Sequence, residues 1–239
     1  MTFLIKTFFR EDKLFRLIDS IRANFKDFKI VIADDSLLTD AKTAVYNQLS
    51  AEGHKILLLP FDSGLSYGRN QLLENSEGVF VMCDDDFVFT EDNGVLEATE
   101  LLAKADIVTG NLYTGRAFTA NNYKLKVKHN AAHKIATESD EIDMGINFFV
   151  SDNHDMRWDE KIKINHEHLD FFLSNELDVR YCPALKVKHD TSSSGDEYKA
   201  YRDRQDDYFF DKWNIDEIIE GDIIIRRNND CVSDDSERR

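Results

Sequence analysis

The sequence predicts an α/β fold in which a mixed, mainly parallel sheet is flanked by helices. Short apolar runs that suit buried strands alternate with amphipathic helical patterns through the first half of the chain. Two of these runs also end directly on acidic residues. Because the carboxyl ends of parallel strands meet at one edge of a sheet, we expect a ligand site there. With 239 residues the chain fits one large α/β unit, so residues 1–226 are predicted as a single domain.

Five elements open the chain in the order strand, helix, strand, helix, strand. They are a strand at Phe3–Ile5, a helix with its apolar face at Leu14, Leu17, Ile18, Ile21 and Phe25, a strand at Lys29–Ala33, a helix at Thr39–Gln48 and a strand at Ile56–Leu59. Crossovers of this kind favour parallel pairing of the strands.

The later elements follow from the same patterns, although the periodicity weakens between residues 111 and 143. We expect helices after Gly64 and at Asn93–Leu102, Glu167–Leu173 and Glu197–Trp213, and strands at Ile107–Gly110, Tyr123–Lys128, Gly145–Val150, Val179–Cys182, Lys186–Asp190 and Asp222–Arg226. The lysine-rich Tyr123–Lys128 is favoured as a solvated edge strand over a mobile region that meets an anionic acceptor. Residues 227–239 are polar and charged, and we expect them to be disordered.

Composition excludes several classes of protein. Thirty Lys and Arg against 46 Asp and Glu give a net charge of −16, which argues against non-specific binding to nucleic acid or to an anionic membrane surface. The three cysteines are widely spaced without a Cys-x-x-Cys pair, which indicates neither a disulfide framework nor a zinc site. No signal peptide or membrane span is recognisable. We therefore expect a cytoplasmic protein, for which peripheral contact with a membrane stays open.

The central feature of the sequence is the apolar run Val79–Cys83, which leads directly into Asp84, Asp85 and Asp86. Three adjacent carboxylates repel one another unless positive charge lies among them. A divalent cation that shares the diphosphate oxygens of a nucleotide would supply this charge. The alternative is a solvated acidic turn after a strand.

Further candidates stand at the ends of other predicted elements. Asp34 and Asp35 follow the second strand, Gly64 and Arg69 open a helix and suit phosphate, and Asn147 interrupts an apolar run. Glu167, His168 and Asp170 begin a later helix and offer a general base, and His189 could complete a metal shell. For each residue alone a structural role is the alternative.

Taken in order, these residues resemble a known family. The motifs are Thr7-Phe-Phe-Arg10, Val31-Ile-Ala-Asp-Asp-Ser36, Gly64…Gly68-Arg-Asn70, Asp84-Asp-Asp-Phe-Val-Phe-Thr90, Asn147-Phe-Phe149, His168-Leu-Asp-Phe-Phe-Leu173 and Lys188-His189. Together they are similar to the GT-A glycosyltransferases of family 2. Within that family they most resemble the β-1,4-N-acetylgalactosaminyltransferases that make gangliosides GM2 and GD2, and their bacterial and viral relatives.

This resemblance implies roles for individual positions. Thr7, Arg10, Asp34 and Asp35 would hold the uridine, and Arg69 would lie near the diphosphate beside Gly64. Asp84 and Asp86 would be the outer members of the Asp-x-Asp motif, flanking Asp85; Asp84 would face the ribose, and Asp86 would bind the metal with His189. Asn147 would lie by the donor sugar or the acceptor. The family's base comes from a Glu-Asp pair, where this chain has Glu167-His168, so Asp170 is the first choice and both others stay open.

The expected activity is transfer of a hexose or N-acetylhexosamine from a UDP-sugar, with UDP-GalNAc favoured, to a hydroxyl of a glycan acceptor. Inversion at the anomeric carbon and dependence on Mn²⁺ or Mg²⁺ are implied by the resemblance. The acceptor class would be a capsule, lipopolysaccharide or glycoprotein glycan. Alternatives are a receiver-like phosphoacceptor domain that binds Mg²⁺, a non-catalytic carbohydrate- or metal-binding module, and a retaining transferase.

Overall fold

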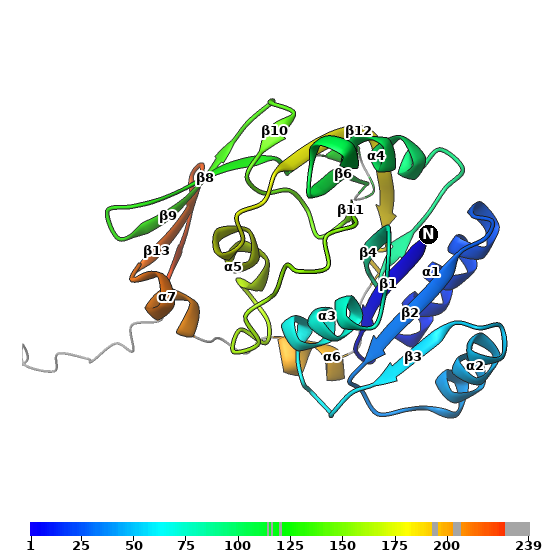
Figure 1. The fold of residues 1–239 in the computed structure, drawn as a ribbon. Coiled ribbons are helices and arrows are strands. Elements are labelled where there is room, and N and C mark those ends of the chain that lie inside the picture. Colours follow the sequence, from blue (N-terminus) through cyan, green and yellow to red (C-terminus); the bar gives the residue numbers. More distant parts are fainter. Residues whose placement is uncertain (114, 116, 120, 193–195, 203–206, 228–239) are drawn as a thin grey trace, which may run out of the picture.

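The protein is described here by a computed structural model of residues 1–227, without residues 114, 116, 120, 193–195 and 203–206 (Figure 1). Two sheets and a set of helices make up this part of the chain. The expected disordered tail lies outside the described residues, except for Arg227. Within the described residues, no helix combines the length and apolar character that crossing a membrane requires.

The larger sheet holds ten strands of the described chain. They are β1 (Thr2–Thr7), β2 (Lys29–Asp34), β3 (Lys55–Leu58), β4 (Phe80–Asp84), β5 (Phe87–Val88), β6 (Ile107–Tyr113), β7 (Phe118–Thr119), β10 (Glu141–Ile142), β11 (Phe149–Ser151) and β12 (Val179–His189). The main path runs β10-β12-β6-β11-β4-β1-β2-β3. β1 pairs in parallel with both β2 and β4, whereas β11 runs antiparallel between β4 and β6. The prediction of a mixed, mainly parallel sheet is therefore confirmed.

Helices cover both faces of this sheet. α1 (Glu11–Asn24), α2 (Asp40–Ala51) and α4 (Val95–Leu101) contribute apolar residues to one core cluster, while α3 (Leu65–Glu74) and α5 (Glu167–Ser174) contribute to the other. The alternating side chains of β1 show the division, since Phe3 and Ile5 face the first cluster and Leu4 faces the second. The sheet is thus buried on both sides, as parallel sheets are.

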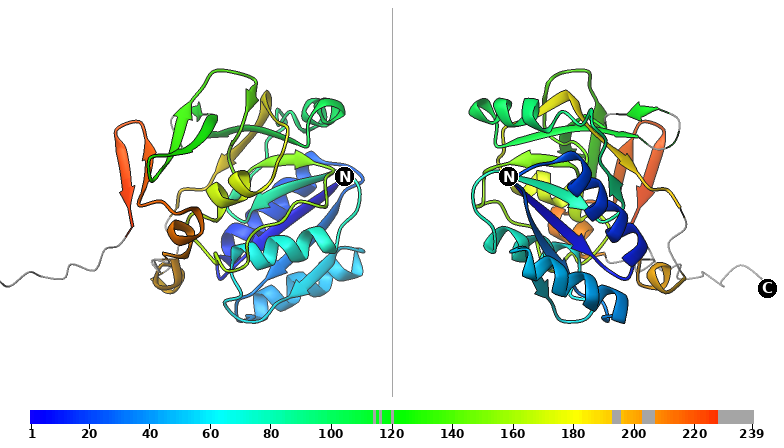
Figure 2. Two further views of the ribbon diagram at one scale, coloured as in Figure 1. Left: turned by 60° about the vertical axis from the view of Figure 1, so that its left-hand side comes forward. Right: turned by 90° about the vertical axis from the view of Figure 1, so that its right-hand side faces the viewer.

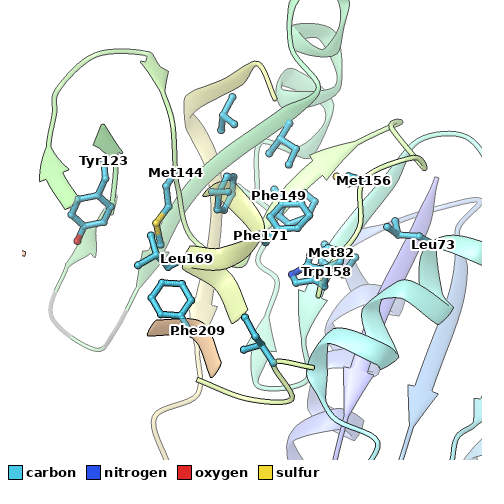
Figure 3. Packing of buried hydrophobic residues seen from close by; sticks show 14 of the residues in the cluster. Leu73, Met82, Tyr123, Met144, Phe149, Met156, Trp158, Leu169, Phe171 and Phe209 are labelled. Carbon is cyan, nitrogen blue, oxygen red and sulfur yellow. The ribbon is translucent and has the colours of Figure 1, made fainter. Parts of the chain in front are cut away.

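A smaller sheet stands beside the larger one, and α5 lies between them (Figures 1 and 2). Its order is β14 (Ile223–Arg226), β13 (Glu217–Glu220), β9 (Ala131–Ala136), β8 (Tyr123–Lys128). Leu169 and Phe171 of α5 share one apolar cluster with Tyr123 of the small sheet and Phe149 of the large sheet (Figure 3). This packing fixes the start of α5 relative to both sheets.

Three sequence predictions need correction. The strand expected at Gly145–Val150 is confined to Phe149–Ser151, because Gly145 packs directly on Thr109 of β6 and the backbone there follows that contact instead of a ladder. The strands expected at Val179–Cys182 and Lys186–Asp190 form one long strand, β12, with a bulge between Tyr181 and Lys186. The helix expected at Glu197–Trp213 is instead two short helices, α6 (Asp196–Arg202) and α7 (Tyr208–Trp213), with residues 203–206 between them outside the described chain.

The bulge in β12 depends on a glycine in the neighbouring strand. A Cβ atom on Gly110 would lie 2.1 Å from the carbonyl oxygen of Leu185, a backbone atom that cannot rotate away. Gly110 therefore lets β6 and β12 approach closely along the segment that carries His189 to the end of β12.

We predict that Gly110→Ala destabilises the fold by about 1–3 kcal/mol, because the added methyl group forces the two strands apart. Urea denaturation followed by circular dichroism measures the change. Leu96→Ala is the control, since Leu96 on α4 is exposed. An unfolding midpoint for Gly110→Ala equal to that of the wild type would contradict the close contact.

Candidate active site

The acidic triplet lies at the carboxyl end of β4, in the middle of the large sheet. Asp85 and Asp86 are buried and Asp84 is half-buried. Each of the three carboxylates meets a positive side chain from another part of the chain. These contacts bring five segments to one place, and they decide what the site can bind.

Asp84 is joined to the start of α5 through an arginine. Arg69 of α3 donates from one guanidinium nitrogen to Asp84 at 2.9 Å and from the other to Glu167 at 3.3 Å. Arg69 is only 1% exposed, and its guanidinium lies over the ring of Trp158. Since the same cation contacts both carboxylates, the triplet and the predicted base region form one network.

Asp85 and Asp86 are bridged by Arg10, which follows β1. Its guanidinium forms an ion pair with Asp85 and donates to Asp86 at 2.6 Å. The Thr7 hydroxyl also donates to Asp85, at 2.7 Å. Burial raises the pKa of Asp85 to about 6 in spite of Arg10. Arg10 thus supplies, in this structure, the positive charge that three adjacent carboxylates require.

His189, at the end of β12, is a further partner of the acidic triplet. Its Nε2 atom lies 3.1 Å from Asp86 Oδ2. Hydrogen bonding to Asp86 raises the pKa of His189 above its usual value. Burial alone would raise the pKa of Asp86, but His189 and Arg10 hold it below its usual value. Within the described residues, no three His, Cys, Asp or Glu side chains are arranged for a metal ion. The carboxylate of Asp84 accepts from Arg69.

A cavity of about 370 Å³ opens beside these residues. Of the predicted nucleotide-binding residues, Thr7, Arg10, Asp35 and Gly64 line it, together with the unpredicted Lys6, Phe8, Asp62, Leu65, Glu160, Lys161, Lys163, Ile164, Tyr198 and Tyr201. Its lining combines cations, carboxylates and aromatic rings. Tyr198 and Tyr201 come from α6, in a segment for which the sequence predicted a helix and no binding role. Phe8 was part of a recognised motif but had no assigned role.

Aromatic rings cluster at one side of the cavity. Phe8, Phe9, Phe61 and Tyr201 contact one another with ring centroids 4.4–6.1 Å apart. The ring of Tyr198 lies 4.4 Å from the guanidinium carbon of Arg10. The cavity therefore combines aromatic rings with charged side chains of both signs.

Asp35 is at the cavity wall, but its carboxylate already has partners. It accepts from the ammonium group of Lys6 and from the backbone N–H of Gly64, the latter at 2.8 Å. Gly68 makes room for this lysine, since a Cβ atom there would lie 2.2 Å from Lys6 Cδ. The two glycines of the Gly64–Asn70 segment thus hold the Lys6–Asp35 pair in place, and the N–H of Gly64 is not directed at a ligand.

Asp34 does not line the cavity. Its carboxylate, 1% exposed, accepts from Lys42 at 2.8 Å and from Tyr46 at 2.6 Å, which ties α2 to the end of β2. The structure therefore separates the two acids of the Asp34-Asp35 pair, and the contacts of Asp34 are structural.

The three base candidates differ in their surroundings. Asp170 is 1% exposed and accepts from Trp213 Nε1 at 2.8 Å and from Lys212, so it fastens α7 to α5. His168 is packed on Phe172, and its Nε2 atom donates to the carbonyl of Gly145 at 2.7 Å. Glu167 is buried but contacts only Arg69 through its carboxylate among the described residues. Of the three, Glu167 alone is linked to the acidic triplet.

Asn147 lies in the segment that leads to β11 and is half-buried. Its neighbours Ile146 and Phe148 are buried, as expected. The Asn147 side chain makes no hydrogen bond to the described residues. Asn147 is not among the residues that line the cavity.

We predict that the neutral state of His168 makes the fold sensitive to acid. Burial lowers its pKa to about 4, whereas the unfolded chain binds a proton near the ordinary value of 6.5. The contribution of neutral His168 to the free energy of unfolding is therefore fully present above pH 6.5. Below that pH it falls by roughly 1 kcal/mol for each pH unit, until the folded form also binds the proton near pH 4. The free energy of unfolding, measured by urea titration at several pH values in this range, should change less steeply with pH in His168→Gln than in the wild type. Equal slopes would show that His168 is not the group responsible.

Comparison with family models matches residues 2–159 to the glycosyl transferase family 2 model. Among curated proteins, β-1,4 N-acetylgalactosaminyltransferase 2 of Mus musculus is 32% identical over 48% of this chain and 23% of its own length. β-1,4 N-acetylgalactosaminyltransferase 1 of Homo sapiens is 34% identical over 46% of this chain and 20% of its own length. This chain thus spans about a fifth of the length of the curated relatives it matches.

Solved structures show the same fold at lower identity. S. aureus TarS 1–349 in complex with UDP aligns with a TM-score of 0.57 at 13% identity, covering 89% of this chain and 68% of that one. The mannosyltransferase PcManGT from Pyrobaculum calidifontis, in complex with GDP-Man and Mn²⁺, aligns with a TM-score of 0.55 at 12% identity, covering 81% and 57%. Both support the GT-A type of fold. With the family model matching well over half of its residues, the chain belongs to glycosyl transferase family 2.

Proposed function

We propose that this chain is an inverting glycosyltransferase that moves a hexose or N-acetylhexosamine from a UDP-sugar to a hydroxyl group of a glycan. The observation that carries the proposal is the double contact of Arg69, which joins Asp84 at the end of β4 to Glu167 at the start of α5. A nucleotide-binding edge and a base candidate are thereby held in one rigid network beside a cavity.

The cavity supports a nucleotide as its ligand. Aromatic faces suit stacking on a base, and Arg10, Lys161 and Lys163 suit the charge of a diphosphate. UDP is favoured because TarS has been solved with UDP and because two curated relatives are named N-acetylgalactosaminyltransferases. We accordingly propose UDP-GalNAc as the first donor to test.

The residues at the end of β4 fit a divalent cation. Asp86 and His189 offer an oxygen and a nitrogen ligand side by side, a pair that suits Mn²⁺ or Mg²⁺ with the remaining ligands from diphosphate and water. A bound ion would neutralise the charge that develops on the departing UDP. Arg10 contacts the same carboxylate oxygen of Asp86 that His189 contacts, so we propose that Arg10 leaves Asp86 for the diphosphate when the donor binds.

We assign the general base to Glu167 in place of Asp170. Asp170 accepts from an ammonium group and an indole, and losing either partner would leave a buried charge. Glu167 has a single, long contact of 3.3 Å to Arg69, which positions the carboxylate without occupying both oxygens. In the proposed step Glu167 takes the proton of the acceptor hydroxyl, the acceptor oxygen bonds to the anomeric carbon, and the bond to the β-phosphate oxygen breaks.

The alternatives are weaker. A receiver-like domain has no use for the Arg69–Glu167 contact or for the second sheet, and the family match places the chain elsewhere. A non-catalytic sugar- or metal-binding module would share the fold, since the fold does not determine activity. Release of UDP from a UDP-sugar distinguishes a glycosyltransferase from such a binding module.

The direct test is a panel of nucleotide sugars scored for release of UDP, with and without glycan acceptors, in the presence of Mn²⁺ or of EDTA. We expect acceptor-dependent release from one UDP-sugar, abolished by EDTA, with inverted configuration in the product. A chain that binds sugars but releases no nucleotide from any donor would be a binding module.

We predict that Glu167→Gln lowers kcat at least about 100-fold, because the general base is lost, without lowering the unfolding temperature by more than a few degrees. Asp170→Asn should do the reverse: it weakens the attachment of α7 and costs about 1–3 kcal/mol of stability while kcat is largely kept. Initial rates and thermal melts of both variants decide the matter. If Asp170→Asn folds normally and is inactive, the base is Asp170.

We predict that Asp86→Ala abolishes metal-dependent binding of UDP, because the carboxylate shared by Arg10 and His189 is removed. Calorimetric titration of UDP in Mn²⁺ and in EDTA measures the metal-dependent part of the affinity. Asp92→Ala is the matched control, since Asp92 is exposed and lies outside the triplet. Equal metal dependence in Asp86→Ala and wild type would place the ion elsewhere.

A further inference from the structure

The last strand of the small sheet presents an apolar edge. β14 pairs with β13 and, within the described residues, with no other strand. Its three isoleucines, Ile223, Ile224 and Ile225, are 61%, 47% and 44% exposed. The hairpin projects at the outer edge of the molecule (Figure 2, red) and lies beyond the residues matched by the family model. An apolar strand with a free edge is a template for pairing with another strand.

The hydrogen-bond pattern of the hairpin fixes which residues of β14 point outward. A two-residue loop, Gly221-Asp222, joins Glu220 to Ile223, with Gly221 at φ 58°. The pair that flanks such a loop exchanges backbone hydrogen bonds, and the pairs then alternate along the ladder. Ile223 and Ile225 therefore bond to β13, whereas the backbone groups of Ile224 and Arg226 face outward.

From this pattern we infer that β14 pairs antiparallel with β14 of a second copy of the chain, about a two-fold axis through Ile224. In this register Ile224 lies opposite Ile224 of the other copy, and both present outward-facing N–H and C=O groups. Asp222 lies opposite Arg226 of the other copy at each end. The small sheets of the two copies join into one continuous sheet with an isologous interface.

The sequence around Ile224 is complementary to itself. Asp222-Ile-Ile-Ile-Arg226 reads acid, three isoleucines, base, so the antiparallel register places opposite charges together at both ends. Asp222 is exposed, and Arg226 is 69% exposed although it donates to Glu217 at 2.9 Å. On one face Ile223 packs against Ile225 of the other copy, and on the other face the two Ile224 side chains meet.

Two other occupants fit less well. Residues 228–239 follow β14 directly, but Val232 is the one branched aliphatic residue in that segment, too little to cover three isoleucines. A lipid surface would accept apolar side chains from one face of the sheet, whereas β14 exposes them on both faces. Pairing with a second strand covers both faces at once.

Sedimentation equilibrium of the full chain, from nanomolar to high micromolar concentration, tests the inference. We expect a reversible change from monomer to a species of twice the monomer mass. A chain that stays monomeric throughout this range overturns the inference. Cosedimentation with vesicles of phosphatidylcholine and phosphatidylglycerol then shows whether the chain binds a membrane. Binding to the vesicles would also count against pairing of copies.

Charge variants test the register. In Asp222→Arg, the new arginine lies opposite Arg226 of the other copy, and in Arg226→Asp the new aspartate lies opposite Asp222. Each variant alone should therefore dimerise with a dissociation constant at least tenfold higher than that of the wild type. A mixture of the two variants should form a mixed dimer, because both ends are then complementary. Failure of the mixture to associate, with both variants folded by circular dichroism, would overturn this register.

Ile224→Pro is a second test that spares the hairpin. The N–H group of Ile224 faces away from β13 in this pattern, so proline removes a bond between copies without removing one within the chain. We expect a monomer with an unchanged melting curve at low concentration. Leu96→Pro would break α4, so the matched control is Leu96→Ser, which removes an exposed apolar side chain elsewhere and should leave the dimer intact. A dimeric Ile224→Pro would contradict the inference.

Discussion

The structure depends on the neutralisation of three adjacent carboxylates at the end of β4. Asp84 is paired with Arg69, Asp85 with Arg10, and Asp86 with both Arg10 and His189. These partners come from α3, from the segment after β1 and from the end of β12, so the repulsion within the triplet is relieved only when these segments have come together. Charge balance at this one point thereby ties together segments that are far apart in the sequence.

The packing of α5 holds Glu167 beside Arg69 and the acidic triplet. The aromatic side of this helix is buried between the two sheets, with Phe171 stacked on Trp158 at 4.1 Å. Lys212 and Trp213 of α7 close over Asp170 at its other side. With the helix held from several directions, its first residue, Glu167, lies in a fixed position against Arg69, as the proposed role of general base requires.

Much of this architecture could be predicted from the sequence. Buried strands ending on Asp34-Asp35 and on Asp84–Asp86 indicated a parallel sheet with an acidic edge, and the structure places the ends of β2 and β4 at that edge. The partners of each carboxylate could not be predicted, because ion pairs such as Lys42–Asp34 and Lys212–Asp170 join residues whose proximity depends on tertiary packing. For the same reason the sequence predicted a helix that includes Tyr198 and Tyr201 but not that their rings line a cavity.

We propose, as the central point, that residues at the end of β4 bind the diphosphate of a nucleotide through one divalent cation. Crystals soaked with Mn²⁺ and UDP test it most directly, because the anomalous signal of manganese locates the ion without reference to activity. The account predicts an ion bound by Asp86 and His189, with the uracil against the aromatic side of the cavity at Phe8 and Tyr201. Crystals in which this region stays empty, or in which manganese binds at another surface, would contradict it.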